Sequence, residues 1–306
     1  MPRPPMQAPK RRVWLHVLLF VLTICTTWFA YYLSLVGGRL LIPANPAVFA
    51  QLALTAAEYS FWVLAILTAH EFGHYFAAKH HRVKATLPFF IPLPLPPLGT
   101  MGAVIRMSPY IPNRRALFDI AVAGPLAGMA IAVPVVFWGL RSATRVPMQS
   151  AGGLLHFGDP LLLRIAEWML LGPRPEGTEI LIGPMAFAGW VGLFVTALNL
   201  LPMSQLDGGH ISYAVFGRRS RIIAMGVFGI LALAMLVTGP TYLLFLALAW
   251  FVGLSHPPTL DDSVELDGRR RALAALVGRV HLELHADADH AGFLASAPGP
   301  VPTAVS

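Results

Sequence analysis

The sequence predicts an all-α polytopic membrane protein with about six transmembrane helices, and three observations support this. Hydrophobic residues make up 56% of the 306 residues and charged residues only 12%, whereas soluble proteins carry roughly 25% charged residues. Apolar segments that approach the length needed to cross a bilayer recur along the chain. The one cysteine, Cys25, lies in such a segment, which excludes an intramolecular disulfide.

The six apolar segments differ in how clearly they are bounded. They are expected at residues 13–37, 53–79, 116–140, 183–202, 222–238 and 240–255. The first is longer than the apolar core of a cleaved signal peptide, so it is interpreted as a retained span. The last three are short or interrupted by glycine and proline, so the pattern does not fix their ends.

Residues 85–115, after the second segment, predict a re-entrant membrane loop that is partly β. The stretch is apolar, but proline recurs in it and cannot donate helix or sheet hydrogen bonds. Extended pieces such as TMGAVIRM are expected to form a hairpin that dips into the membrane, where irregular backbone is tolerated only against protein or a water-filled cavity. A proline-rich surface loop is the alternative.

Basic residues are distributed unevenly between the two predicted sides. With the N-terminus in the cytoplasm, five of the 22 Lys and Arg residues fall on the far side, namely Arg39, Arg141, Arg145, Arg164 and Arg174. The other seventeen are cytoplasmic, which satisfies the positive-inside rule. The net charge of +7 therefore needs no nucleic-acid partner. A bacterial cytoplasmic membrane fits the absence of targeting signals.

Three regions follow from this topology. Residues 1–12 are a cytoplasmic basic N-terminus, 13–256 form the integral membrane domain, and 257–306 form a cytoplasmic tail. The tail is expected to be helical near 264–286 and disordered at its end. On the far side, residues 141–182 predict an interfacial amphipathic helix or cap.

The second span ends in AHEFGHYFAAKHH, which contains the H-E-x-x-H pattern at His70, Glu71 and His74. On a helix, the two histidines share a face one turn apart and can bind one zinc ion. Glu71 lies beside them, where it can accept a proton from the attacking water. Ionisable groups in a span are costly to bury, so this pattern favours a functional metal site over polar pairing.

A catalytic zinc site requires a third protein ligand. His80 and His81 belong to a basic run that favours a solvated surface, and Asp119 is interpreted as a helix-start carboxylate. Glu58 is too far along the same helix. Asp207, in NLLPMSQLDGGH, is the best candidate because it ends an apolar segment and precedes two glycines that permit close backbone approach. An Asp-Gly turn is its structural alternative.

Four motifs in order resemble the site-2 proteases, which are intramembrane zinc metalloproteases. They are HEFGHYFAAK, PFFIPLPLPPLGTMGAVIRM, NRRALFDIAVAGPLAG and NLLPMSQLDGGH. The resemblance implies one zinc ion per chain held by His70, His74 and Asp207. It implies that Glu71 is the general base and that Asn199 binds substrate or stabilises the transition state.

The resemblance further implies hydrolysis of peptide bonds in or next to transmembrane segments of membrane-protein substrates, with a catalytic core at about 53–220. Residues 85–110 would pair with an unwound substrate as an added strand. The chain resembles the compact bacterial and archaeal type, whose last motif reads L-P-x-x-Q-L-D-G-G-H. Residues 141–182 are too short for the PDZ domain that some relatives carry, and no nucleotide-sensing domain is evident after residue 256. The substrate itself and the cut site are not specified by the motifs.

The sequence leaves two other functions open, and two further features, at His210 and at Gly124 and Gly128, have structural interpretations. A catalytically silent membrane adaptor would keep the shape without the chemistry, and a zinc transporter would need polar residues along several spans. His210 is interpreted as a structural or supporting residue near the metal rather than a ligand. Gly124 and Gly128 form a GxxxG pattern that predicts close helix packing, with homodimerisation as the weaker interpretation.

Overall fold

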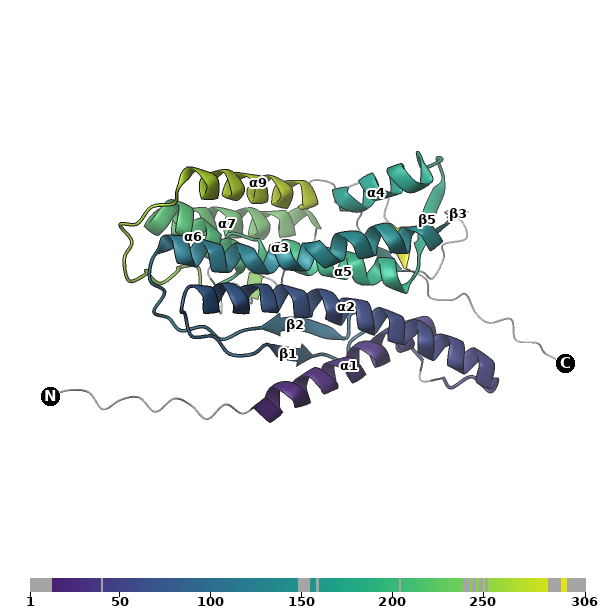
Figure 1. Cartoon of the computed structure of the whole chain (residues 1–306). Coiled ribbons are helices and arrows are strands. Elements are labelled where there is room, and N and C mark those ends of the chain that lie inside the picture. The colour runs from purple at the N-terminus through teal and green to yellow at the C-terminus, as the bar shows by residue number, and fades with distance from the viewer. Residues whose placement is uncertain are drawn as a thin grey trace.

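The computed structural model (Figure 1) is mostly helical. It describes residues 13–39, 41–147, 155–157, 160–203, 205–238, 243, 246–247, 250, 253–285 and 293–295. The helices are α1 (Val13–Leu35), α2 (Pro46–His80), α3 (Arg114–Gly139), α4 (Leu161–Leu171), α5 (Pro184–Asn199), α6 (Asp207–Phe216), α7 (Ser220–Thr238) and α9 (Gly268–His285). The strands are β1 (Phe89–Pro92), β2 (Thr100–Val104), β3 (Thr144–Pro147), β4 (Leu155–Phe157), β5 (Thr178–Ile182) and β6 (Phe293–Ala295).

Within the described residues, four helical segments are long and apolar enough to cross a bilayer. They are residues 13–35, 46–80, 114–142 and 207–236, the last of which runs through α6, a short 3-10 turn and α7. The predicted fourth span corresponds to α5, which has only 16 residues. Most of the predicted sixth span, 240–255, lies outside the described residues. The membrane character is thus supported, while the count of six spans stays a prediction.

Local signals explain where the central helices begin. The side chain of Asn45 accepts a hydrogen bond from the amide of Ala47 (2.9 Å), and Pro46 occupies the first helical position of α2. This cap starts α2 seven residues before the predicted boundary at residue 53, because Asn and Pro are favoured at these two positions. Asn113 caps α3 in the same way through the amide of Ala116.

The proline-rich stretch after α2 contains the predicted hairpin. β1 and β2 pair antiparallel, with Phe89 opposite Val104. The hairpin lies alongside α1 and α2 (Figure 1), with the phenyl ring of Phe20 in α1 packed 4.8 Å from that of Phe90. The partly β character of this loop is confirmed, and its depth in the membrane stays a prediction.

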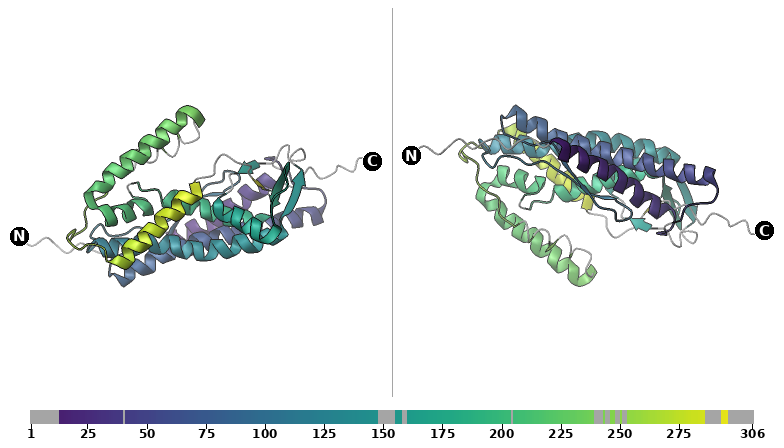
Figure 2. Two further views of the ribbon diagram at one scale, coloured as in Figure 1. Left: turned by 90° about the horizontal axis from the view of Figure 1, so that it is seen from above. Right: turned by 90° about the horizontal axis from the view of Figure 1, so that it is seen from below.

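The main core lies between α1, α2, α3 and α5. Its largest buried side chains include Tyr31, Tyr59 and Phe187, and the rings of Tyr31 and Tyr59 stack at 4.3 Å. α7 diverges from this bundle (Figure 2), and its large side chains such as Leu236 are exposed. In a membrane protein such exposed apolar surface is expected to face lipid.

The end of the molecule that holds α4 contains more β-structure than the sequence predicted. The amphipathic helix expected in 141–182 is present as α4, but a four-stranded sheet of order β3-β5-β6-β4 accompanies it. The strands have three to five residues, so their alternation is too brief to be recognised in the sequence. The end of the predicted disordered tail, residues 296–306, lies outside the described residues.

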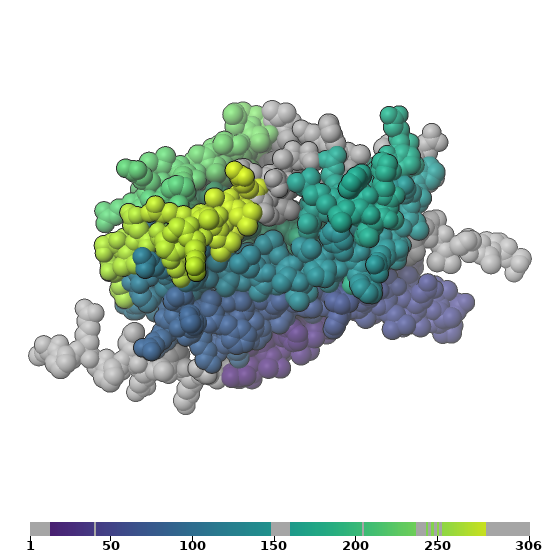
Figure 3. Space-filling model, turned by 45° about the horizontal axis from the view of Figure 1, so that its top comes forward, coloured from purple at the N-terminus to yellow at the C-terminus, as the bar shows by residue number. Residues whose placement is uncertain are grey.

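The C-terminal helix α9 corresponds to the helix predicted near 264–286. It is not a free tail, because Leu266 and Val277 are buried with Leu117 and Phe118 of α3. In the space-filling view α9 lies on the surface of the bundle beside α3 (Figure 3). The C-terminal segment is therefore part of the folded unit.

Candidate metal centre

The H-E-x-x-H residues lie in the last third of α2 and all face the interior. His70 is 3% exposed, Glu71 4% and His74 5%. The four-residue spacing places both imidazoles on one face, as predicted. Burying three ionisable side chains in an apolar helix costs free energy unless they pair with one another or bind a ligand.

Asp207, the first residue of α6, completes a compact cluster with the two histidines. Its Oδ2 lies 3.1 Å from Nε2 of His70, and its Oδ1 lies 3.2 Å from Nε2 of His74. The two Nε2 atoms are themselves 3.1 Å apart. Residues 137 positions apart in sequence are thus brought together as the sequence predicted.

These separations fit a zinc ion. Tetrahedral zinc with bonds of about 2.0–2.1 Å holds its ligand atoms about 3.3 Å apart, close to the 3.1–3.2 Å observed here. Nδ1 of His74 donates to the carbonyl of Ile120 (2.8 Å), which leaves Nε2 as the bare nitrogen facing the cluster. Zinc-binding histidines commonly carry such a partner on the other ring nitrogen. The three residues can therefore hold a metal ion.

Glycines allow α3 to approach the cluster closely. A Cβ atom on Gly124 would lie 2.0 Å from Nε2 of His74, and one on Gly128 would lie 3.2 Å from the His70 ring. Any larger residue at position 124 would occupy the space of the imidazole. The predicted close packing of the GxxxG pattern is confirmed, and the face it forms is occupied by α2 of the same chain rather than left open for a second copy.

A third glycine fixes the position of α6. A Cβ atom on Gly208 would lie 1.9 Å from the carbonyl oxygen of Leu200, so the first turn of α6 presses against the turn that follows α5. Asn199 is the last residue of α5 and immediately precedes that turn. It is half-buried and lies next to the segment that carries Asp207.

The end of the hairpin also reaches the cluster. The backbone amide of Ile105, one residue beyond β2, interacts with the carboxylate of Glu71. This contact links the proline-rich segment directly to the predicted base, which sequence spacing alone did not indicate.

The other candidates for the third ligand contribute no atom to the cluster. Asp119 bonds Nε2 of His81 (2.9 Å) and the guanidinium of Arg270 (2.7 Å for each of two contacts). The prediction that His81 is merely solvated is therefore wrong, because it is half-buried against Asp119. His80 is exposed as predicted, and Glu58 is also exposed on α2.

The sequence matches the model of a known protein family. A family model described as Peptidase family M50 matches residues 58–239, a stretch that contains the whole cluster. The chain belongs to peptidase family M50. The predicted resemblance to site-2 proteases is thereby confirmed at the level of the family. No solved structure matches this M50 chain.

Two curated proteins to which the chain is similar come from plants. The chain is 32% identical over 231 residues to "Probable zinc metalloprotease EGY1, chloroplastic" of Arabidopsis thaliana, covering 72% of this chain and 41% of the relative. It is 34% identical over 241 residues to the rice protein of the same name (Oryza sativa subsp. japonica), covering 74% and 40%. The chain thus spans about two fifths of the length of these relatives. Their chloroplast names do not support the narrower bacterial or archaeal assignment.

Proposed function

We propose that this chain is an intramembrane zinc metalloprotease that hydrolyses peptide bonds in or next to transmembrane segments of other proteins. The observation that carries the proposal is the buried cluster of His70, His74 and Asp207, with ligand atoms 3.1–3.2 Å apart and Glu71 beside it. Membership of the M50 family and the names of its metalloprotease relatives support the same activity.

The proposed roles follow from chemistry and position. His70, His74 and Asp207 hold one zinc ion, which when bound supplies Lewis acidity toward the scissile carbonyl and the attacking water. Glu71 accepts the proton of that water on its carboxylate and delivers it to the leaving amine. Its burial excludes bulk water that would compete for the proton. Asn199 donates from its amide to the substrate backbone or to the oxygen that gains negative charge.

The hairpin supplies a route for the substrate. A transmembrane helix must unwind before its amides can be attacked, and an unwound segment can pair with an exposed strand edge. The contact between the Ile105 amide and Glu71 supports β2 as that edge, because a strand that runs along β2 ends beside the base. The hairpin is accordingly proposed to be re-entrant, within a domain of about six spans.

We also propose an orientation in the membrane. Arg114 donates to the carbonyls of Ala214 and Val215, and Arg115 donates to that of Glu265. These bonds gather basic segments at the end where α2 finishes, α3 begins and α6 ends. The positive-inside rule supports that end as the cytoplasmic one, in a bacterial cytoplasmic membrane.

A cysteine introduced at Lys79 should then react with impermeant thiol reagents only from the cytoplasmic side.

Purified protein with a labelled transmembrane peptide tests the activity. Glu71→Gln is expected to lower the cleavage rate by at least about 100-fold while leaving one zinc per chain, because Glu71 is not a ligand. Glu58→Gln, the same change at an exposed position of the same helix, should cleave like the wild type. Equal cleavage by wild type and Glu71→Gln would refute the protease.

The alternatives predict different outcomes in the same preparation. A catalytically silent adaptor would bind the peptide without any cleavage by the wild type. A zinc transporter would accumulate zinc in sealed vesicles, and such uptake would persist when the peptide is omitted.

A further inference from the structure

The segment that follows the predicted sixth span packs against α6 through His210 and Tyr213. Residues 256–271, here called the C-terminal strap, make backbone hydrogen bonds to the loop before α3, from Leu260 to Ile111 (2.9 Å) and from Asp261 to Pro112 (3.1 Å). The hydroxyl of Tyr213 in α6 donates to Asp262 of the strap (2.7 Å). The strap therefore joins the two helices that frame the metal cluster.

One strap residue, His256, contacts a histidine of α6. Its Nε2 lies 2.6 Å from Nδ1 of His210, and its ring stacks on that of Tyr213 with centroids 4.5 Å apart. The other ring nitrogen, Nδ1, lies 2.5 Å from the carbonyl oxygen of Pro257. Two half-buried imidazoles and a carbonyl thus form a continuous hydrogen-bonded row.

The row determines where the protons lie. A carbonyl oxygen can only accept, so Nδ1 of His256 carries a hydrogen. Burial lowers the pKa of His256, so the ring is neutral near pH 7 and its Nε2 is bare. Nδ1 of His210 must then donate to that nitrogen, and the Nε2 of a neutral His210 is left as an acceptor.

His210 is close to the metal cluster. It follows Asp207 by three residues and therefore lies on the same face of α6, one turn further along. It interacts electrostatically with both Asp207 and His74. The tautomer and orientation of its ring therefore matter to the site, although it contributes no ligand atom to the cluster.

We propose that His256 is a positioning residue for the reaction, which holds His210 in the tautomer with a bare Nε2 and so fixes a neutral hydrogen-bond acceptor beside the metal cluster. The acceptor would receive a hydrogen bond from a backbone N–H of the bound substrate. His256 acts only through His210 and touches neither metal nor substrate. This inference rests on the proposed proteolytic function.

The full-length protein tests it with two variants of His256. His256→Leu removes the acceptor for His210, and we expect kcat to fall on the order of 10-fold with one zinc per chain retained. His256→Gln keeps an acceptor oxygen at that position and is expected to stay within about twofold of the wild type. His80→Leu, at an exposed histidine near the same end of the bundle, is the matched control and should not change kcat.

A spectroscopic readout separates positioning from a structural role. The ¹⁵N spectrum of histidine-labelled protein should show His210 protonated on Nδ1 in the wild type and in His256→Gln, and a mixture of tautomers in His256→Leu. Tyr213→Phe removes the hydrogen bond to Asp262 but keeps the ring that stacks on His256. It should leave kcat and the His210 signal unchanged.

Two results would overturn the inference. One is a wild-type His210 protonated on Nε2, whatever the activity. The other is an equal loss of kcat in His256→Leu, His256→Gln and Tyr213→Phe, which would mean that the strap acts through docking alone. An inactive wild type with His210 in the expected tautomer would instead contradict the proposed protease and remove any role of His256 in catalysis.

Discussion

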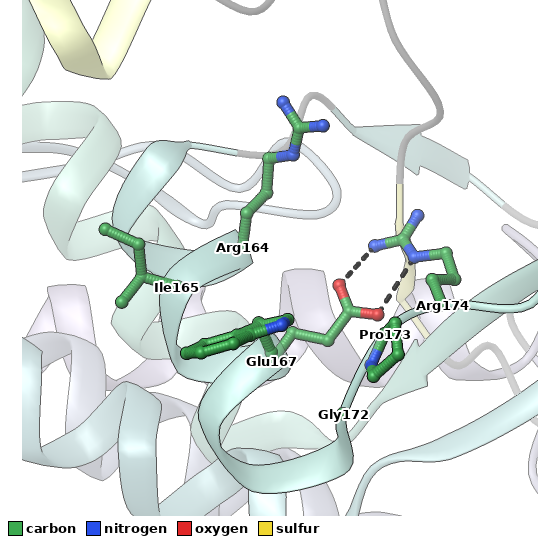
Figure 4. A pocket seen from close by; sticks show the side chains of 7 residues that line it. Arg164, Ile165, Glu167, Gly172, Pro173 and Arg174 are labelled. Carbon is green, nitrogen blue, oxygen red and sulfur yellow. Dashed lines mark hydrogen bonds and ion pairs between the residues drawn. The ribbon is translucent and has the colours of Figure 1, made fainter.

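Two carboxylates at opposite ends of the bundle, the buried Glu167 and the half-buried Asp207, have different partners. Glu167 of α4 accepts two hydrogen bonds from Arg174, at 3.0 and 2.7 Å, beside a pocket of about 370 Å³ (Figure 4). Asp207 faces two imidazole nitrogens instead. Among the described residues, no lysine or arginine pairs with Asp207.

The difference lies in how each negative charge is balanced. A guanidinium in bidentate contact neutralises Glu167 within the protein, so this carboxylate needs nothing further. The side chains that face Asp207 are imidazoles, which carry no fixed positive charge and can bind a metal ion through a ring nitrogen, so its carboxylate is suited to a metal ion. Glu167 is therefore interpreted as structural, whereas Asp207 can contribute to a metal site.

The largest expected effect comes from exchanging the two carboxylates for neutral residues. Asp207→Ala should lose the zinc ion, and so should His70→Ala, because two ligands hold zinc far more weakly than three. Glu167→Gln should keep one zinc per chain and lower the free energy of unfolding by about 2 kcal/mol, since Arg174 loses its charged partner. Metal analysis and thermal unfolding measure both.

Undiminished zinc in both ligand variants would refute the ligand assignment. Zinc loss in Glu167→Gln would contradict a purely structural role for Glu167 and would show that the two ends of the bundle are coupled.

An intermediate effect is expected from substitution of the glycines at which α3 approaches the histidines of the metal cluster. Gly124→Ala should lower zinc affinity at least about 10-fold, because the new methyl group would fall 2.0 Å from Nε2 of His74. Gly128→Ala, with 3.2 Å available, should have a weaker effect. Gly229→Ala in α7 is the control, since nothing lies within 4 Å of its Cβ position.

Competition with a chelator measures the three affinities. Equal affinities for Gly124→Ala and Gly229→Ala would mean that α3 does not limit the space for the metal ligands.

The smallest expected effect is a weaker docking of the C-terminal strap as the pH falls. Burial alone would raise the pKa of Asp262, but hydrogen bonds from Thr259 and Tyr213 outweigh it and hold the pKa below its usual value. The amide of Arg270 lowers the pKa of Asp267. Such carboxylates stabilise the docked strap above their unfolded pKa of about 3.9, and this contribution is lost as the pH falls below it.

A nitroxide attached to Ala272→Cys, in α9 directly after the strap, in a Cys25→Ser background reports how firmly the strap is docked. We expect an immobile spectrum at pH 6 and a more mobile one near pH 3. The double variant Asp262→Asn/Asp267→Asn should lose most of this pH dependence. If its spectrum still becomes mobile between pH 6 and pH 3 to the same extent, these two carboxylates do not control the docking of the strap.

Much of this arrangement follows from local signals in the sequence. The apolar runs and the caps at Asn45 and Asn113 specify the helices, since capping and hydrophobicity act over a few residues. The i,i+4 spacing of His70 and His74 specifies a shared face without any tertiary information. Asp207 was predicted as the third ligand because an acid beside two glycines at the end of an apolar run has few structural reasons to be there.

Other features were decided only when distant segments met. The sequence offered no reason to pair Asp119 with Arg270, 151 residues away, or His210 with His256, because such pairs carry no periodicity. The short strands beside α4 were also missed. They are too short to show a pattern in the sequence, and β5 finds one of its partners, β6, far away in the C-terminal segment. Likewise, Gly124 suggested close packing, but only the fold identified His74 as its neighbour.

The sequence by itself thus determined the helices, the membrane character and the residues of the metal cluster, because each depends on hydrophobicity or on spacing within one turn of helix. Only the packed chain shows that Arg270 pairs with Asp119, how closely α3 approaches the histidines, and that the C-terminal strap contacts α6. Those outcomes depend on contacts across more than 40 residues of sequence, as between His210 and His256, and such contacts form only when the whole chain packs.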